Sequence, residues 1–568
     1  MRESRNNVFK GIDERILISG GVDIASSMSN FRISSDGSLE KRPENNQVLN
    51  IGAAIEGIWK GKLDGEDVTV FSAGGELIKL YRDEGTFEVL GVIGTGHCEF
   101  FVFGGALYVM NGSTYTKLSG GVLSSVEGYI PTIAVSCTPD GAGTSFEQLN
   151  LLTDKRKQLF SADGISTEYK LAESDIRSVE SVYCSGVEIT GYTVDTSAGK
   201  ITFALPPAEG LNSLEVIYSK SGNDRGLITG CRKAMPFGGN SDGRIFLWGN
   251  AAKPNCRFHS ELANGIPSAE YFPVNNFTLI GNDEITCIVQ QYNKQLIFTK
   301  NAAYYSYCEL NTDSLGNVYS SFPVFNLNGE KGCLLLMNGC VIDNMPVTLC
   351  GDGLNVWEST SVENEKNAVC ISGAISETAK LAITFGVDSG NVKLFDFPIS
   401  RELFFYAGGT LNVYDYTNGR WYRYNGMDMD EYCVCGQELY YSKGAYLYVF
   451  SESESYCGNT VNCSYRSAYT NFGYVSGRFD LVGAYADVYI VGPVSAAIAF
   501  EDAAGRNCSR VYRFAAGESG ARRLEIRPHL KRCGPVRLTV TLTGAGSLNI
   551  NGFTVKTKKR ERSSRSGI

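Results

Sequence analysis

Short runs of alternating apolar and polar residues, each closed by a glycine turn, recur along most of this chain. In residues 68–81 the run VTVFSA is followed by Gly74-Gly75 and a second run, ELIKLY. Residues 100–110 (FFVFGGALYVM) and 403–414 (LFFYAGGTLNVY) have the same form. A period of two predicts strands with one buried face, and glycine supplies the positive φ angles of tight turns. The pattern therefore predicts a series of β-hairpins.

The hairpin theme returns every ~40–50 residues, which is the interval of propeller blades. Further copies lie at residues 244–248, 285–307, 333–357 and 432–450. Each copy supplies the strands of one blade, and blades arranged around an axis bury the faces that a single blade leaves open. We therefore expect an all-β protein built on a β-propeller of about six to eight blades. An array of β-sandwiches without closure is the structural alternative.

Two segments depart from this theme and predict separate domains. Their short strands at wider and less regular spacing are typical of β-sandwiches. The expected order is an N-terminal arm and hairpin at 1–53, a propeller at 54–130 and 226–456, an inserted β-sandwich at 131–225, a C-terminal β-sandwich at 457–556 and a flexible tail at 557–568. The tail is predicted to be flexible because it is basic and poor in apolar residues.

The amino-acid composition favours an all-β protein and argues against one that binds nucleic acid over its whole surface or spans a membrane. The chain has 64 Gly against 15 Pro, together with 31 Tyr and 29 Phe, which suits many strands and many turns. A net charge of −9 argues against a protein that grips nucleic acid over its whole surface. Residues 1–21 have no apolar core typical of a signal peptide, and no apolar run reaches the ~18 residues needed to span a bilayer. We expect no membrane insertion.

The cysteines are expected to be small reduced hydrophobes. Their number, seventeen, is odd, and Cys287, Cys333, Cys350 and Cys370 lie within apolar strand-like runs. In a chain made and kept in cytosol such thiols stay unpaired.

A search for reactive groups predicts no catalytic residue, no cofactor and no metal. The three histidines, His97, His259 and His529, are far apart, and His97-Cys98 has no second ligand pair at zinc-site spacing. Cys433 and Cys435 are interpreted as structural thiols on one face of a strand. No phosphate-binding loop and no G-x-S-x-G nucleophile motif occurs. We expect a protein that is not an enzyme.

The most basic region before the tail has three interpretations. It comprises Arg522, Arg523, Arg527, Lys531 and Arg532. These side chains suit a solvated face beside acidic neighbours, a contact with another subunit, or a contact with DNA phosphates.

Several short motifs resemble one family. Asn30-Phe31-Arg32, the turn at residues 36–39 and Lys41-Arg42-Pro43 resemble the N-terminal signature of phage tail-nozzle and packaged-DNA-stabilisation proteins, although Glu44 stands where glycine is common. Motifs in both predicted sandwiches are similar as well: residues 131, 150–153, 169–171, 201–203, 206–207, 210–212, 476–479 and 500–502. The resemblance covers most of the chain as scattered short motifs.

The resemblance implies a structural virion protein with a propeller core. Such a protein forms a homo-hexameric ring in the head-to-tail or tail-nozzle assembly, assembled in the bacterial host cytoplasm. The ring retains packaged DNA, lets it pass through the lumen without sequence specificity, and contacts a portal or adaptor protein and tail-fibre or tail-tip proteins. We expect assembly contacts at Asn30, Arg32, Arg42, Lys558, Lys559 and Arg560, and expect residues 30–43 and 556–565 to become ordered only in the particle.

Two other functions remain open. A carbohydrate-binding or receptor-binding propeller adhesin would present exposed aromatic side chains in a concave pocket. A propeller glycosidase would present two carboxylates about 5–9.5 Å apart in a central cleft. A ring protein would instead present complementary surfaces on opposite flanks of one subunit.

Overall fold

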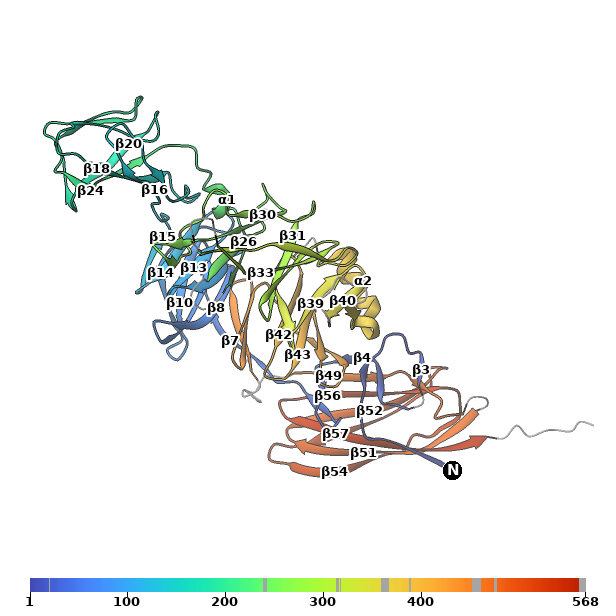
Figure 1. Ribbon diagram of the computed structural model, residues 1–568. Coiled ribbons are helices and arrows are strands. Elements are labelled where there is room, and N and C mark those ends of the chain that lie inside the picture. The colour runs from blue at the N-terminus through green and yellow to red at the C-terminus, as the bar shows by residue number, and fades with distance from the viewer. Residues whose placement is uncertain are drawn as a thin grey trace, which may run out of the picture.

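The computed structural model shows an all-β protein with three bodies in a row. Figure 1 shows the inserted domain at one end, the propeller in the middle and a β-sandwich at the other end. The structure describes residues 1–19, 21–238, 243–312, 316, 318–358, 367–387, 390–451, 461–474 and 478–560. Among these residues, no helix is long and apolar enough to cross a membrane.

The described residues form seven propeller blades, each an antiparallel sheet. The first is β8 (Ile55–Leu63), β9 (Glu66–Ala73), β10 (Glu76–Tyr81) and β11 (Thr86–Val92); the second is β12 (Glu99–Phe103), β13 (Ala106–Met110), β14 (Tyr115–Ser119) and β15 (Val122–Ser125). The third is β25 (Lys233–Phe237), β26 (Arg244–Trp248), β27 (Cys256–His259) and β30 (Phe277–Leu279); the fourth is β31 (Ile285–Gln291), β32 (Lys294–Thr299), β33 (Ala303–Tyr307) and β36 (Val324–Asn328), with β37 (Met337–Asn338) parallel to β31.

The remaining blades complete the circle. The fifth is β38 (Cys340–Ile342), β39 (Met345–Cys350), β40 (Gly353–Trp357) and β41 (Ala368–Cys370); the sixth is β42 (Val392–Phe397), β43 (Glu402–Ala407), β44 (Thr410–Asp415) and β45 (Arg420–Asn425). The seventh is β46 (Tyr432–Cys435), β47 (Glu438–Lys443), β48 (Tyr446–Ser451) and β7 (Asn45–Asn50). Two short ribbons, β28 (Leu262–Ala263) with β29 (Ile266–Pro267) and β34 (Glu309–Thr312) with β35 (Val318–Ser321), extend from the third and fourth blades.

An N-terminal strand closes the propeller. β7 pairs antiparallel with β48, from Asn45 opposite Phe450 to Asn50 opposite Tyr446. The innermost strand of the first blade, β8, then contacts both β46 and β12. The prediction of a propeller is confirmed, and the alternative of an unclosed array is wrong. Residues 45–50 are a correction to the expected arm at 1–53, because they supply the fourth strand that the last blade lacks.

The inserted domain has its own core. It contains β16 (Thr132–Cys137), β17 (Thr144–Ser145), β18 (Lys155–Ala162), β19 (Glu168–Lys170), β20 (Ser178–Cys184), β21 (Val187–Glu188), β22 (Tyr192–Asp195), β23 (Lys200–Phe203) and β24 (Gly210–Ser219). A six-stranded and a three-stranded sheet enclose buried Phe160, Tyr169 and Val216. The short helix α1 (Gly226–Thr229) follows where the chain returns to the propeller.

The terminal sandwich combines both ends of the chain. Its strands are β1 (Arg2–Asn6), β2 (Gly11–Ile12), β3 (Ile18–Ser19), β4 (Ile24–Ser29), β5 (Phe31–Ile33), β6 (Leu39–Lys41), β49 (Cys463–Ser467), β50 (Tyr469–Thr470), β51 (Arg478–Val491), β52 (Val494–Asp502), β53 (Asn507–Phe514), β54 (Ser519–Ile526), β55 (Leu530–Cys533), β56 (Val536–Thr543) and β57 (Ser547–Arg560). The N-terminal strands pair into both sheets, so they lie within the sandwich and not in a separate arm.

The first four residues of the expected tail, 557–560, lie in a strand. β57 continues to Arg560 because β51 pairs with it on one side, and β1 pairs with it on the other. Thr557 is buried while Lys558, Lys559 and Arg560 are exposed, so residues 557–560 belong to a strand. The remainder of the predicted tail, residues 561–568, lies outside the described residues.

Neither the short helix α1 nor a second, longer helix was predicted from the sequence. α2 (Ser376–Phe385) follows a 3-10 turn, η1 (Ser372–Ile375), and lies between the fifth and sixth blades in sequence. Its buried side chains are Ala379 and Ala382, whereas Leu381 and Phe385 are exposed. This weak amphipathic pattern contains no long apolar face, which explains why the sequence pattern did not reveal it.

The half-buried Asp396 on β42 predicts a pH-dependent stability. Burial raises the pKa of Asp396 from 3.8 to about 6, and its Oδ1 accepts no hydrogen bond within the described residues. Between pH 3.8 and about 6 the folded protein binds more protons than the unfolded chain, so stability falls as pH rises through this window. At pH 7 Asp396→Asn should stabilise the protein by about 1 kcal/mol after allowance for solvent screening.

Urea unfolding at pH 7 and below pH 3.8 tests this expectation. The gain from Asp396→Asn should be present at pH 7 and absent at the lower pH, whereas the exposed control Asp67→Asn should change neither value. An equal gain at both pH values would show that charge burial is not the cause.

Candidate functional site at the joint between propeller and sandwich

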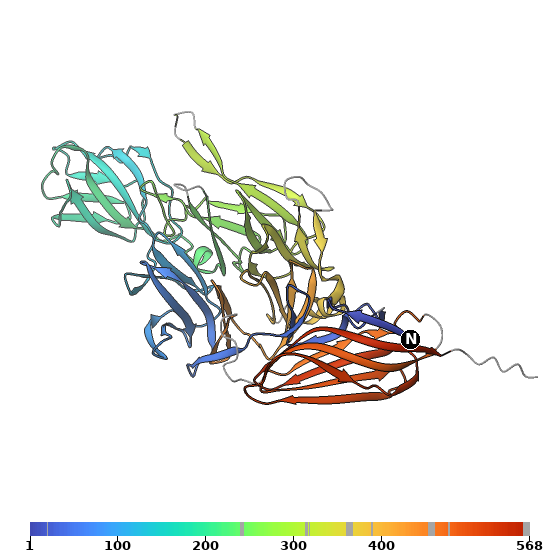
Figure 2. The same ribbon diagram turned by 90° about the horizontal axis from the view of Figure 1, so that it is seen from below.

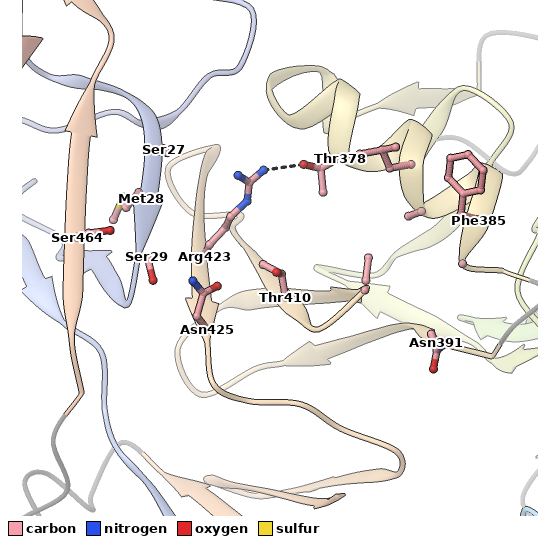
Figure 3. A pocket seen from close by; sticks show the side chains of 15 residues that line it. Ser27, Met28, Ser29, Thr378, Phe385, Asn391, Thr410, Arg423, Asn425 and Ser464 are labelled. Atoms are coloured by element: carbon pink, nitrogen blue, oxygen red, sulfur yellow. Dashed lines mark hydrogen bonds between the residues drawn. The ribbon is translucent and has the colours of Figure 1, made fainter. Parts of the chain in front are cut away.

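A groove of about 630 Å³ lies where the sixth blade meets the terminal sandwich. Figure 3 shows α2 on one side and the sandwich strands β4 and β49 on the other, with Arg423 and Asn425 of β45 between them. The lining is Ser27, Met28, Ser29, Thr378, Leu381, Ala382, Phe385, Gly386, Asn391, Ala407, Gly408, Thr410, Arg423, Asn425 and Ser464.

A charged group from the N-terminal segment binds the start of α2. The Glu14 carboxylate accepts the backbone N–H groups of Glu377 and Thr378 at 3.1 and 3.3 Å, and the Thr378 hydroxyl at 2.7 Å. Glu14 also pairs with Arg423. Burial alone would raise the pKa of Glu14, but hydrogen bonds from Arg423 and Thr378 outweigh it and lower the pKa. A carboxylate here is favoured further by the helix dipole, so Glu14 fastens the N-terminal segment to the propeller.

Asn30 connects three parts of the chain. Its backbone N–H donates to the Arg423 carbonyl of the propeller at 2.8 Å, and its Nδ2 donates to the Asn462 carbonyl at 2.8 Å. Its Oδ1 accepts Arg42 Nε at 2.9 Å and the Asn425 N–H at 2.8 Å. Asn30 has φ +58°, a left-handed conformation that asparagine tolerates better than most residues. This residue type therefore suits both the backbone and the hydrogen bonds.

Arg42 fills the space beside Asn30. It is 2% exposed, lies 5.6 Å from the centre of the Tyr424 ring, and donates to the carbonyls of Pro43 and Asn425 at 2.7 and 3.2 Å. Burial lowers the pKa of Arg42, and these partners offset the cost of burying a guanidinium. Arg42 thus binds the propeller to the start of the sandwich.

A buried ion pair continues this network into the sandwich. Lys41 Nζ lies 3.1 Å from Glu44 Oε1, and the two side chains are 1% and 0% exposed. Lys41 also donates to the carbonyls of residues 544–546 in the turn between β56 and β57. The family that this chain resembles commonly has glycine at this position. In this chain Glu44 forms an ion pair with Lys41 instead.

The structure changes the interpretation of the predicted contact residues. Asn30 and Arg42 are brought together and buried inside this chain, where they bind residues of the same subunit. Their expected contact with another subunit stays a prediction. Arg32 is half-buried and lies 3.5 Å from Glu40. The expectation that residues 30–43 become ordered only in the particle also stays a prediction.

The other predicted contacts lie away from the joint. Lys558 and Lys559 are exposed at the end of β57, and Arg560 pairs with Asp480 at 2.8 Å. In the basic stretch of the sandwich, Arg523 pairs with Asp487 at 2.7 Å and Arg527 pairs with Glu525 at 3.0 Å. For Arg523 and Arg527, two of the five basic residues, these ion pairs favour the interpretation as a solvated face beside acidic neighbours.

The histidines occupy separate structural positions. His97 Nδ1 lies 2.9 Å from Glu431, and its Nε2 lies 3.3 Å from Lys233, so it joins the starts of innermost strands from three blades. Burial lowers the pKa of His259 to about 3, and His529 is exposed. Within the described ranges, no group of three or more His, Cys, Asp or Glu is arranged to hold a metal ion.

The thiols provide a direct test of the cysteine interpretation. The sixteen described cysteines are all unpaired, and burial raises the pKa of Cys98 to about 11 and of Cys350 to about 12. Cys370, expected inside the fold, is exposed at the outer strand of the fifth blade. In denaturant without reductant we expect all seventeen thiols to react with a thiol reagent, with no stoichiometric zinc by metal analysis. A deficit of two thiols would reveal a disulfide.

Sequence reasoning missed Glu14, Thr378 and Arg423. They are far apart in sequence, and each lies in a run with no distinctive motif. Only the packing of α2 against the N-terminal segment brings them together.

Comparisons with known proteins identify no family for this chain. No protein-family model and no curated protein matches this chain. A chain of a mitotic checkpoint complex is 9% identical with a TM-score of 0.34, covering 72% of this chain and 95% of that one. PorZ of the Porphyromonas gingivalis type-IX secretion system is 11% identical with a TM-score of 0.33, covering 74% of this chain and 42% of that one. An exo-β-1,3-galactanase from Phanerochaete chrysosporium is 8% identical with a TM-score of 0.17, covering 81% and 95%. Likeness at this level carries no argument about function.

Proposed function

We propose that this chain is a non-enzymatic structural subunit of a phage particle, forming a ring of the head-to-tail or tail-nozzle assembly. The proposal rests on one observation, the joint in which Asn30 and residues 41–44 connect β45 of the propeller to the terminal sandwich. Asn30 and the segment Lys41-Arg42-Pro43, which resemble the family's N-terminal signature, are the residues that fasten the sandwich to the propeller. The resemblance and the structural role thus fall on the same residues.

A ring subunit needs domains held at a constant angle. A buried ion pair, a buried guanidinium and a left-handed asparagine specify one geometry, since any other arrangement leaves polar groups unpaired. The joint therefore supports a subunit whose propeller and sandwich keep one orientation. In the proposed homo-hexamer, packaged DNA passes through the lumen without sequence specificity, consistent with a net charge of −9 that disfavours tight binding of DNA.

The oligomeric state tests this proposal. The mass of the purified chain should be measured alone and mixed with portal or adaptor proteins, and particles should be imaged by electron microscopy. We expect closed rings, either alone or on the adaptor. A chain that stays monomeric in both conditions contradicts the proposed function.

The groove supports a second candidate, a glycan-binding adhesin. Its lining combines neutral hydrogen-bonding groups, such as Thr410 and Asn425, with Phe385, which is 76% exposed. Aromatic faces and neutral polar groups suit a sugar. Glycan-array binding that is lost in Phe385→Ala and kept in the control Phe146→Ala would favour this candidate; an array without binding removes it.

A further inference from the structure

A two-stranded ribbon projects from the fourth blade. β34 and β35 pair antiparallel from Glu309 opposite Ser321 to Thr312 opposite Val318, and they hydrogen-bond to no other strand in the described residues. In Figure 2 this ribbon extends at the top, away from the other blades. An isolated pair of strands is marginally stable in water, so the ribbon needs a surface to pack on.

Both faces of the ribbon carry exposed apolar side chains. Leu310 and Val318 are 70% and 66% exposed, and Tyr319, on the opposite face, is 54% exposed. Side chains alternate between faces along a strand, so neither face is packed on this molecule. Both faces are therefore available to a partner.

The base of the ribbon is aromatic. Tyr305 and Tyr307 on β33 stack with Phe325 on β36, with ring centres 5.2 and 5.6 Å apart. Tyr307 donates to Glu309 at 2.8 Å, at the start of the ribbon. Partly exposed aromatic residues of this kind are enriched at the centres of protein interfaces.

The opposite flank of the propeller offers a fitting surface. β11 is the outermost strand of the first blade, with no strand on its outer side in the described residues. It exposes Phe87, Val89 and Val92. Figure 2 shows the first blade at the lower left, across the propeller from the ribbon. An open strand edge and an open ribbon both have backbone groups able to pair with another strand.

We propose that the ribbon of one copy docks on β11 of the next copy, which rests on the ring proposed above. A closed ring needs two different surfaces on opposite flanks of one subunit, and the ribbon and β11 provide them. Charge also fits: Lys294 lies over Tyr305 at the ribbon's base, while Glu84 and Glu88 flank Phe87. The occupant is a second copy of this chain.

The test uses two variants and their mixture. The ribbon variant is Leu310→Ser/Val318→Ser/Tyr319→Ser, and the edge variant is Phe87→Lys/Val92→Lys. Each should weaken self-association at least about 100-fold, measured by sedimentation of the full chain. Mixed together they should form a one-to-one heterodimer, because one intact ribbon still meets one intact edge. The control Leu205→Ser/Leu211→Ser removes equally exposed side chains of the inserted domain and should assemble like the wild type.

Each outcome decides between the proposals. If the wild type assembles and the ribbon variant assembles equally well, the ribbon inference fails while the ring stands. If the edge variant assembles and only the ribbon variant does not, the ribbon binds something other than β11. If the wild type stays monomeric with its adaptor, the ring proposal itself fails. Unchanged thermal unfolding of both variants shows that lost assembly is not lost folding.

Discussion

Glu44→Ala should destabilise the protein by about 3–5 kcal/mol, because it leaves the Lys41 ammonium buried without its carboxylate. Lys41 and Glu44 are 1% and 0% exposed, so water does not replace the lost partner. The effect should appear in the transition of the terminal sandwich, since Lys41 contacts residues 544–546 there. All four tryptophans lie in the propeller, between the two parts of the chain that form the sandwich, so calorimetry and circular dichroism are the suitable measurements.

Two controls separate charge burial from loss of packing. The exposed pair Glu377–Lys380 has side chains 70% and 68% exposed, and Glu377→Ala should cost less than about 0.5 kcal/mol. The double variant Lys41→Met/Glu44→Leu should recover most of the loss, because an apolar pair removes both desolvation costs. If Glu44→Ala loses no more unfolding free energy than Glu377→Ala does, the buried pair does not stabilise the joint.

Asn30→Ala should cost about 3–5 kcal/mol through two separable causes. It removes three side-chain hydrogen bonds, one of them to the buried Arg42 guanidinium. It also places alanine at φ +58°. Asn30→Gly removes the same hydrogen bonds but relieves the backbone, so it should be about 1 kcal/mol more stable than Asn30→Ala.

The same variants test whether the joint fixes the angle between the domains. Small-angle scattering should show a broader distribution of shapes for Asn30→Gly than for the wild type. Asn328→Gly, within the fourth blade, is a control for introducing glycine at a buried asparagine away from the joint, because its side chain bonds to Asn367, Glu330 and Lys331. Identical scattering of wild type and Asn30→Gly would mean that Glu14 and the Lys41–Glu44 pair suffice to hold the angle.

The alternation of side chains determined the fold class without tertiary information. Runs such as residues 68–81 and 403–414 specify hairpins locally, because each glycine pair turns the chain and each apolar face needs a neighbour. Their recurrence indicated the propeller, and the closed set of seven blades lies within the expected range. The buried core of the inserted segment likewise follows from its own strands, Phe160, Tyr169 and Val216 among them.

Only the tertiary structure decided where the chain ends belong. β7 is polar and has no hairpin partner next to it in sequence, yet it pairs with the edge of β48. The composition of residues 557–560 predicts a basic tail, but β51 pairs with all four of these residues and β1 also pairs with Thr557. Glu14, Asn30 and Arg42 connect the sandwich to the propeller because they contact Arg423 and Asn425, which lie hundreds of positions away in sequence. Local patterning specifies strands and turns, whereas pairing of distant edges and burial of distant charges depend on contacts that no local pattern encodes.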